Sequence, residues 1–223
     1  GLEIDPSRLY PSERIRRCGT VDKPRSGNGA YFWDGTRGWV FDWSGEAQTI
    51  WYNDPQAKPW SDDEKRLWAA KRASAATEQE RRYQQAAIKA DEVLRSAKLD
   101  NHPYLEMKGF PDQRGLVLGD KLLVPMRNVV TNKLQGYQEI WWDMDERKYV
   151  KKMMLGMRAK NAVLYLGHRE SNECWLVEGL ATGLSLKNAF RSVGLAPSVV
   201  VCFSASNMIQ VADQIPGKRF VFA

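Results

Sequence analysis

The sequence predicts an α/β protein whose C-terminal segment, residues 171–223, folds as a parallel βαβαβ sheet. Three apolar runs in this segment, 175–177, 198–203 and 219–222, are separated by segments of helical composition. Apolar runs that alternate with helices are typical of parallel strands covered on both faces. We expect a β-meander, a long helix and a small aromatic-rich β module before this sheet.

The composition is that of a globular chain. It has 223 residues, 43% of them hydrophobic, which suggests one or two domains. No apolar run approaches the roughly 20 residues that a membrane-spanning helix needs, and the start lacks the pattern of a signal peptide. We therefore expect a cytoplasmic protein that does not bind a membrane.

Residues 1–60 are predicted to form the small β module. Two short aromatic strands, 29–33 and 39–43, flank Asp34-Gly35, a strong signal for a β-hairpin. The module is crowded with aromatic residues: Tyr31, Phe32, Trp33, Trp39, Phe41, Trp43, Trp51 and Tyr52. These side chains form either its core, which we favour, or a platform on which single-stranded bases stack.

Residues 61–99 are predicted to form a helical connector. Ser61 supplies an N-cap before an acidic first turn, and neither Gly nor Pro interrupts residues 61–97. Its apolar positions are mostly Ala, which favours an exposed helix with at most one break. The helix should end before Asp100-Asn101-His102-Pro103, because proline disfavours helical geometry in the residue before it.

Residues 100–170 are predicted to form a basic subdomain built on a β-meander, with strands at 122–127, at 134–142 and from Lys148 onward. Pro125 predicts an edge strand or a bulge. Six cations follow with no Asp or Glu among them: Arg147, Lys148, Lys151, Lys152, Arg158 and Lys160. Such a cluster attracts nucleic-acid phosphates. The alternative is a solvated hairpin edge that lysines protect from aggregation.

Glu178 is the candidate catalytic residue. It directly follows the apolar run 175–177, and functional groups of open parallel sheets gather at the carboxyl ends of the strands. A carboxylate there can act as a general acid/base or support Mg²⁺, although one carboxylate alone binds Mg²⁺ poorly. The alternative is that Glu178 caps a helix starting near Leu180. The three cysteines and two histidines lack the short spacing of a zinc site, so no zinc is expected.

Several segments resemble Toprim-domain DNA primases of phages and plasmids. The run from Trp175 to Leu186 resembles the first Toprim motif, with Glu178 as its glutamate and Gly179 and Thr182 in the turn behind it. Three earlier segments resemble the catalytic region of these primases in the same order: 102–105, 123–126 and 134–140. In this family a later strand carries an Asp-x-Asp pair. Residues 218–223 resemble that strand, so we expect the first Asp directly after Ala223, with this chain truncated before the motif.

The resemblance implies a nucleotidyltransferase that makes RNA primers on single-stranded DNA during phage or plasmid replication. It implies Mg²⁺ (or Mn²⁺), nucleoside triphosphates and a DNA template as ligands, with a replicative helicase as a further candidate partner. Glu178 would be the catalytic and partial metal-binding residue, and the basic cluster would contact the template. This fragment alone is expected to be inactive. The alternatives are a non-catalytic module that binds single-stranded nucleic acid, and a Toprim nuclease or topoisomerase.

Overall fold

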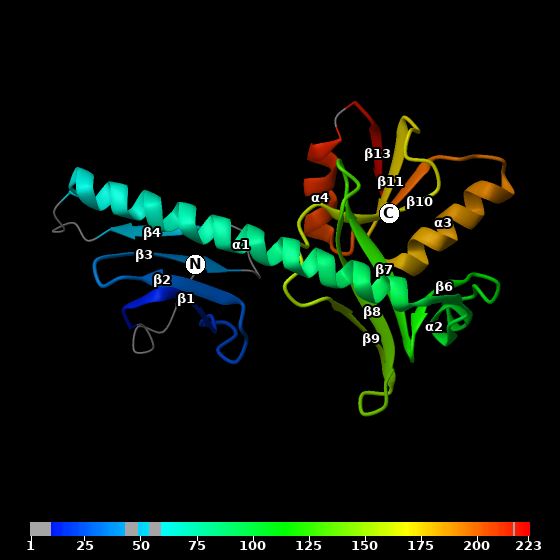
Figure 1. Cartoon of the computed structure of the whole chain (residues 1–223), viewed down its shortest axis with the longest axis horizontal. Helices are drawn as coiled ribbons and strands as arrows, with labels where there is room; N and C mark the ends of the chain where they lie inside the picture. The colour runs from blue at the N-terminus through cyan, green and yellow to red at the C-terminus, as the bar shows by residue number, and fades with distance from the viewer. Residues whose placement is uncertain (1–9, 43–48, 54–58, 216) are drawn as a thin grey trace. The chain divides into compact units, whose positions relative to one another are not determined.

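The computed structural model describes residues 10–42, 49–53, 59–215 and 217–223 (Figure 1). The chain divides into two compact units, residues 1–70 and residues 71–223. The boundary falls inside the long helix α1, Asp62–Ser96, so each unit includes part of this helix.

The unit of residues 1–70 contains an antiparallel sheet in the order β1-β2-β3-β4. Its strands are β1 Ser12–Cys18, β2 Gly29–Trp33, β3 Arg37–Asp42 and β4 Ile50–Asn53. The predicted Asp34-Gly35 hairpin is confirmed. Asp34 Oδ1 accepts hydrogen bonds from the backbone nitrogens of Thr36 and Arg37, at 2.9 and 2.7 Å. Gly35 has a φ of 109°, which few other residues adopt.

The aromatic residues of this unit divide between core and surface. Tyr31 is buried, and the rings of Trp60 and Trp68 stack with their centroids 5.4 Å apart. Trp51 and Tyr52 on the edge strand β4 are instead 68% and 54% exposed. The unit therefore has both an aromatic core and a candidate stacking surface. Trp43 lies outside the described residues.

Helix α1 is continuous over 35 residues, without the break that the sequence allowed. Its start is a capping box: Ser61 Oγ accepts from the Glu64 nitrogen at 3.2 Å, and Glu64 Oε2 accepts from the Ser61 nitrogen at 2.8 Å. The helix is largely exposed, as predicted. In its second half Ala86 and Ala90 are buried, and Ala90 packs in a cluster with Leu123 and Tyr137.

In the unit of residues 71–223, nine described strands form one mixed sheet in the order β13-β11-β12-β10-β7-β6-β5, and β8 and β9 extend from β7. The strands are β5 Lys98–Asp100, β6 Gly115–Leu118, β7 Lys121–Asn128, β8 Leu134–Asp143, β9 Lys148–Met153, β10 Ala162–Leu166, β11 Glu173–Val177, β12 Ser198–Val201 and β13 Arg219–Phe222. The remaining helices are α2 Pro103–Met107, α3 Leu180–Ser192 and α4 Ala205–Gln214. The meander of residues 100–170 and the sheet of residues 171–223 are thus joined through β10, which pairs with both β7 and β12.

The parallel βαβαβ arrangement is confirmed. Strand β11 pairs in parallel with β12 on one side and with β13 on the other. Helix α3 covers one face, where Leu180 and Leu184 pack in a cluster with Val177. Helix α4 covers the other, where Met208 and Val211 pack with strand residues that include Leu176 and Val200. Because helices cover both faces, the strands have unbroken apolar runs.

Pro125 does not mark an edge strand, because β7 has neighbours on both sides. On one side β7 pairs with β8 throughout, and Pro125 lies opposite Tyr137. On the other side β6 pairs with residues up to Leu123, and β10 pairs only from Arg127 onward. Pro125 falls in the gap between β6 and β10, where a missing backbone donor is tolerated. A register shift after Met126 supplies the irregularity that the proline predicted.

Candidate functional site at the carboxyl ends of the parallel strands

Glu178 lies where the sequence placed it, directly after β11 at the carboxyl end of the parallel strands, and it is exposed. Its backbone is held by the neighbouring chain: its carbonyl accepts a hydrogen bond from the Phe203 nitrogen at 2.9 Å. Phe203 is buried and has a φ of 66°, an uncommon conformation for a bulky residue. The end of β12 therefore bends around the backbone of Glu178 and fixes its position.

Glu178 does not cap helix α3. The N-cap is Gly179, in an extended conformation and with no side-chain hydrogen bond to the first turn. Among the described residues, no donor or cation partners the Glu178 carboxylate. Thr182, one turn along, is exposed, and its Oγ1 would be 3.9 Å from a Cβ atom at Gly179. The carboxylate is thus available for a ligand rather than committed to the fold.

Strand β13 runs beside Glu178 in a defined register. Leu176 lies opposite Phe222, and the Ala223 nitrogen donates to the Leu176 carbonyl at 3.0 Å. The end of β13 therefore lies beside the end of β11, at the edge of the sheet where Glu178 follows β11.

The buried side chain of Asn207, on the first turn of α4, organises the same edge of the sheet. Its Nδ2 donates to the carbonyls of Ala162 and Cys202, both at 2.9 Å, and its Oδ1 accepts from the Asn161 nitrogen at 2.8 Å. Sequence reasoning missed Asn207. The sequence signal that could have located it is Ser204, a residue type favoured at helix N-caps. Ser204 Oγ accepts a hydrogen bond from the Asn207 nitrogen at 3.3 Å, so the helix begins at Ala205 and Asn207 lies in its first turn.

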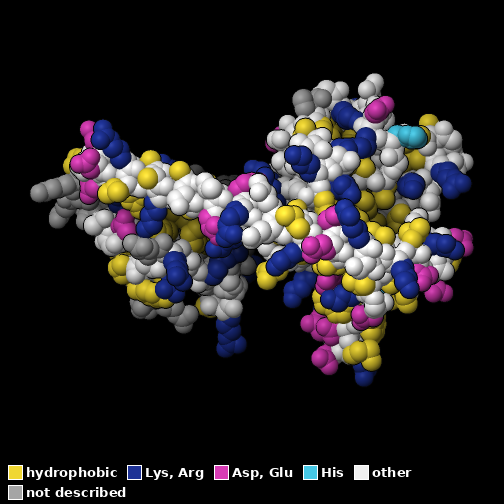
Figure 2. Space-filling model, viewed as in Figure 1, with side chains coloured by type: hydrophobic (Ala, Val, Ile, Leu, Met, Phe, Trp, Pro, Cys, Tyr) yellow, Lys and Arg dark blue, Asp and Glu magenta, His cyan; other side chains and the backbone are white. Residues whose placement is uncertain are grey.

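Four of the six predicted basic residues belong to the β8–β9 hairpin, and their surroundings are less basic than the sequence suggests. Asp143, Asp145 and Glu146 gather at the hairpin tip beside Arg147 (Figure 2). Lys148 pairs with Glu146 at 2.5 Å, which raises the pKa of Lys148. Lys152 lies opposite Glu139, whose carboxylate forms an ion pair with Lys121 at 2.8 Å. Lys151 lies on the other face, with its Nζ 5.4 Å from the centre of the Tyr104 ring.

Arg158 and Lys160 lie in the loop before β10 and differ in their contacts. Arg158 forms an ion pair with Glu80 of α1, and its guanidinium lies 4.7 Å over the Tyr83 ring. Lys160 is exposed, two residues before β10 begins. Five strand spacings of about 4.8 Å separate β9 from β11, so the hairpin lysines lie on the order of 24 Å from the β11 strand that precedes Glu178. Of the six, Lys160 is nearest to Glu178 in sheet order.

The described residues supply one carboxylate for a metal at this edge, and in this part of the chain no three His, Cys, Asp or Glu side chains form a group that could hold an ion. Mg²⁺ prefers several oxygen ligands, so Glu178 fits as one ligand of a larger set. The thiols of Cys174 and Cys202 are no candidate nucleophiles. Burial raises the pKa of Cys174 to about 11 and that of Cys202 to about 12.

Within the described ranges, no helix has both the length and the apolar character needed to cross a membrane. No protein-family model, no curated protein and no solved structure matches this chain.

Proposed function

We propose that this chain is the catalytic part of a Toprim-type DNA primase from a phage or plasmid. The observation that carries the proposal is the exposed, unpartnered Glu178 at the carboxyl end of the middle parallel strand. The order of the primase-like segments and the neighbouring strand β13 support it further. Such an enzyme acts in the cytoplasm on single-stranded DNA and nucleoside triphosphates, with a replicative helicase as a candidate partner.

In the proposed reaction the 3′-hydroxyl of the growing primer attacks an incoming nucleotide and pyrophosphate leaves. Glu178 would act as a general base and accept the proton of this hydroxyl, either directly or through a water molecule. It would also contribute an oxygen ligand to Mg²⁺, together with the acidic pair expected after Ala223. The metal ion, when bound, neutralises the charge that develops on the phosphate oxygens.

The test compares Glu178→Gln with Glu170→Gln. Both glutamates are exposed, but Glu170 lies in the loop between β10 and β11, at the opposite end of the strand that Glu178 follows. Ribonucleotide incorporation on a single-stranded template is measured for this chain and for a form that continues through the codons after Ala223. We expect incorporation by the longer form, its loss in Glu178→Gln and its retention in Glu170→Gln. Full activity of Glu178→Gln would exclude this residue from the mechanism.

A second candidate is a non-catalytic module that binds single-stranded nucleic acid. The exposed rings of Trp51 and Tyr52 favour it, because exposed aromatic rings can stack on bases of any sequence. Binding without incorporation in both forms of the chain would select this candidate. Cleavage of the template in the same assay would select a Toprim nuclease or topoisomerase instead.

A further inference from the structure

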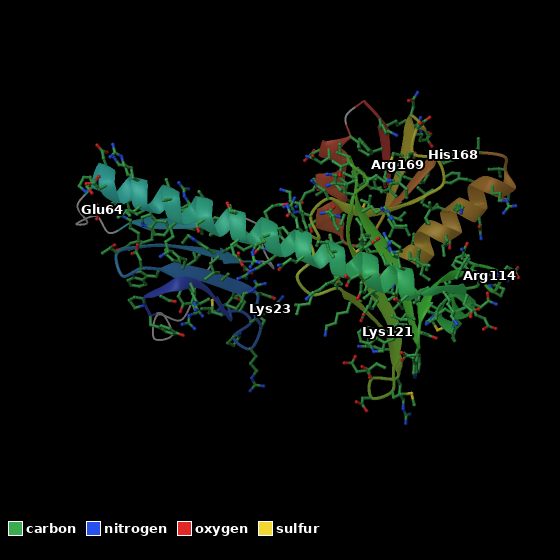
Figure 3. All side chains as sticks on the ribbon, viewed as in Figure 1. Lys23, Glu64, Arg114, Lys121, His168 and Arg169 are labelled. Carbon is green, nitrogen blue, oxygen red and sulfur yellow. The ribbon has the colours of Figure 1, made fainter. Side chains whose placement is uncertain are left out.

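A basic cluster that no sequence motif indicated lies at the turn between β7 and β8. Arg127 Nη1 donates to the Asn132 carbonyl at 3.2 Å, and Arg169 Nη2 donates to the Val129 carbonyl at 2.8 Å. Both carbonyls belong to one turn, so the two guanidinium groups converge on it. Arg169 comes from the loop after β10, where it is labelled beside His168 (Figure 3). We call Arg127, Lys133 and Arg169 the turn cluster.

The turn that carries the cluster is held by its own hydrogen bonds. Asn128 Oδ1 accepts from the nitrogens of Val130 and Thr131, at 3.0 and 2.9 Å. Val129 is buried, and its nitrogen donates to the Asn161 carbonyl at 2.9 Å. The positions of the two guanidinium groups are therefore set by backbone before any ligand arrives, which lowers the entropy that binding costs.

The cations of the turn cluster are not held in ion pairs. In the described part of the chain, none of the three has a carboxylate within ion-pair distance. The two sequence segments that meet here, 121–138 and 147–169, contain no Asp or Glu, and the exposed Glu170 directly follows the second of them. Lys218, whose Nζ donates to the Ser171 carbonyl at 2.8 Å, adds a further cation beside Arg169. Figure 2 shows Lys and Arg side chains gathered over this part of the unit.

This arrangement differs from that of the β8–β9 hairpin, where acidic residues offset the lysines. Uncompensated like charges repel one another, and phosphate groups relieve this repulsion. Guanidinium groups suit phosphate in particular, because each presents a planar fork of donors. The Arg169 guanidinium also makes a cation–π contact, because it lies 4.5 Å over the centre of the Tyr165 ring.

We propose that the turn cluster binds the phosphodiester backbone of single-stranded DNA. The identity of this polymer rests on the proposed function, whereas the anionic character of the ligand rests on the cluster itself. The cluster, rather than the hairpin tip, is then the principal phosphate-binding surface of the unit of residues 71–223.

The test is the salt dependence of binding to a fluorescent oligothymidylate, measured with the whole chain. Lys133→Gln is the first variant, because its side chain makes no contact that holds the turn. Lys98→Gln, an exposed lysine on the far edge strand β5, removes the same charge elsewhere. Removal of one phosphate contact reduces the steepness of log K against log salt by about 0.7 for single strands. We expect this change for Lys133→Gln, about twice this change for Arg127→Gln combined with Arg169→Gln, and none for Lys98→Gln.

Two results would overturn the inference: an unchanged slope in all the cluster variants, or an equal change in Lys98→Gln, which would indicate net charge alone. If the double variant Arg127→Gln with Arg169→Gln is unstable, the double variant Arg127→Lys with Arg169→Lys is measured in its place, because it keeps both charges. This pair should keep the slope and bind more weakly. The outcome is independent of Glu178→Gln, which tests primer synthesis. Unchanged slopes together with intact synthesis would refute the turn cluster alone, and changed slopes without synthesis would refute the primase alone.

Discussion

The guanidinium of Arg158 forms an ion pair with the carboxylate of Glu80, 78 residues earlier in the sequence. The contact fastens the loop before β10 to helix α1, and the Tyr83 ring adds a cation–π contact to it. This loop leads into Lys160 and Asn161 at the strand edge that holds Glu178. Arg158 is thus engaged within the protein, although the sequence predicted it as a phosphate contact.

We expect Arg158→Ala to lower the free energy of unfolding by about 1 kcal/mol, since a half-exposed ion pair and a cation–π contact each contribute a fraction of that amount. A double-mutant cycle with Glu80→Gln, followed by urea denaturation, should give a coupling energy of about 0.5 kcal/mol. The salt slope of DNA binding should not change in Arg158→Ala. A decrease of that slope would return Arg158 to the template-binding residues.

Gly183 is a buried residue of α3 that faces the sheet. A Cβ atom there would lie 2.8 Å from Leu166 Cδ1 and 2.9 Å from Val201 Cγ2, both on side chains of the core. Gly183→Ala should therefore destabilise the protein by about 1–2 kcal/mol, because overpacking outweighs the gain in helix propensity. Ser185→Ala, at an exposed position of the same helix, is the control and should change stability by less than about 0.5 kcal/mol. Equal chemical denaturation curves for the two variants would mean that α3 packs less tightly than described.

The buried thiols predict an alkaline loss of stability. Burial raises the pKa of Cys174 to about 11 and that of Cys202 to about 12, whereas thiols in an unfolded chain have a pKa of about 8.5. Above that pH the unfolded state releases protons that the folded state retains, so the free energy of unfolding falls as pH rises toward 11. Denaturation at a series of pH values measures this slope. Cys174→Ala with Cys202→Ala should flatten it, and an unchanged slope in that variant would assign the effect to groups other than these two thiols.

Local signals predicted the elements whose hydrogen bonds close within a few residues. The Ser61 N-cap and the Asp34-Gly35 hairpin lie where the sequence placed them, and the apolar runs of β11 and β12 indicated a parallel sheet. Contacts between distant segments left no such signal. Pairing of β10 with β7 joined the meander to the parallel sheet, and the fold alone brings Arg169 to Val129, 40 residues away.

The candidate site divides in the same way. Glu178 could be located because a strand end is a local feature, and its exposure agrees with a functional role. The basic surface could not be located, because charge spacing along the sequence says nothing of acidic residues on a neighbouring strand. Glu139, opposite Lys152 on β8, is one such residue.

The side chain of Asn207 has a consequence for how the molecule opens. Its three hydrogen bonds join the start of β10, the end of β12 and the first turn of α4. Separating any one of these segments from the others therefore breaks a hydrogen bond of the buried Asn207 side chain. We expect them to exchange their amide hydrogens as one cooperative unit rather than to fray separately. The backbone that presents Glu178 then keeps its shape until that whole unit opens.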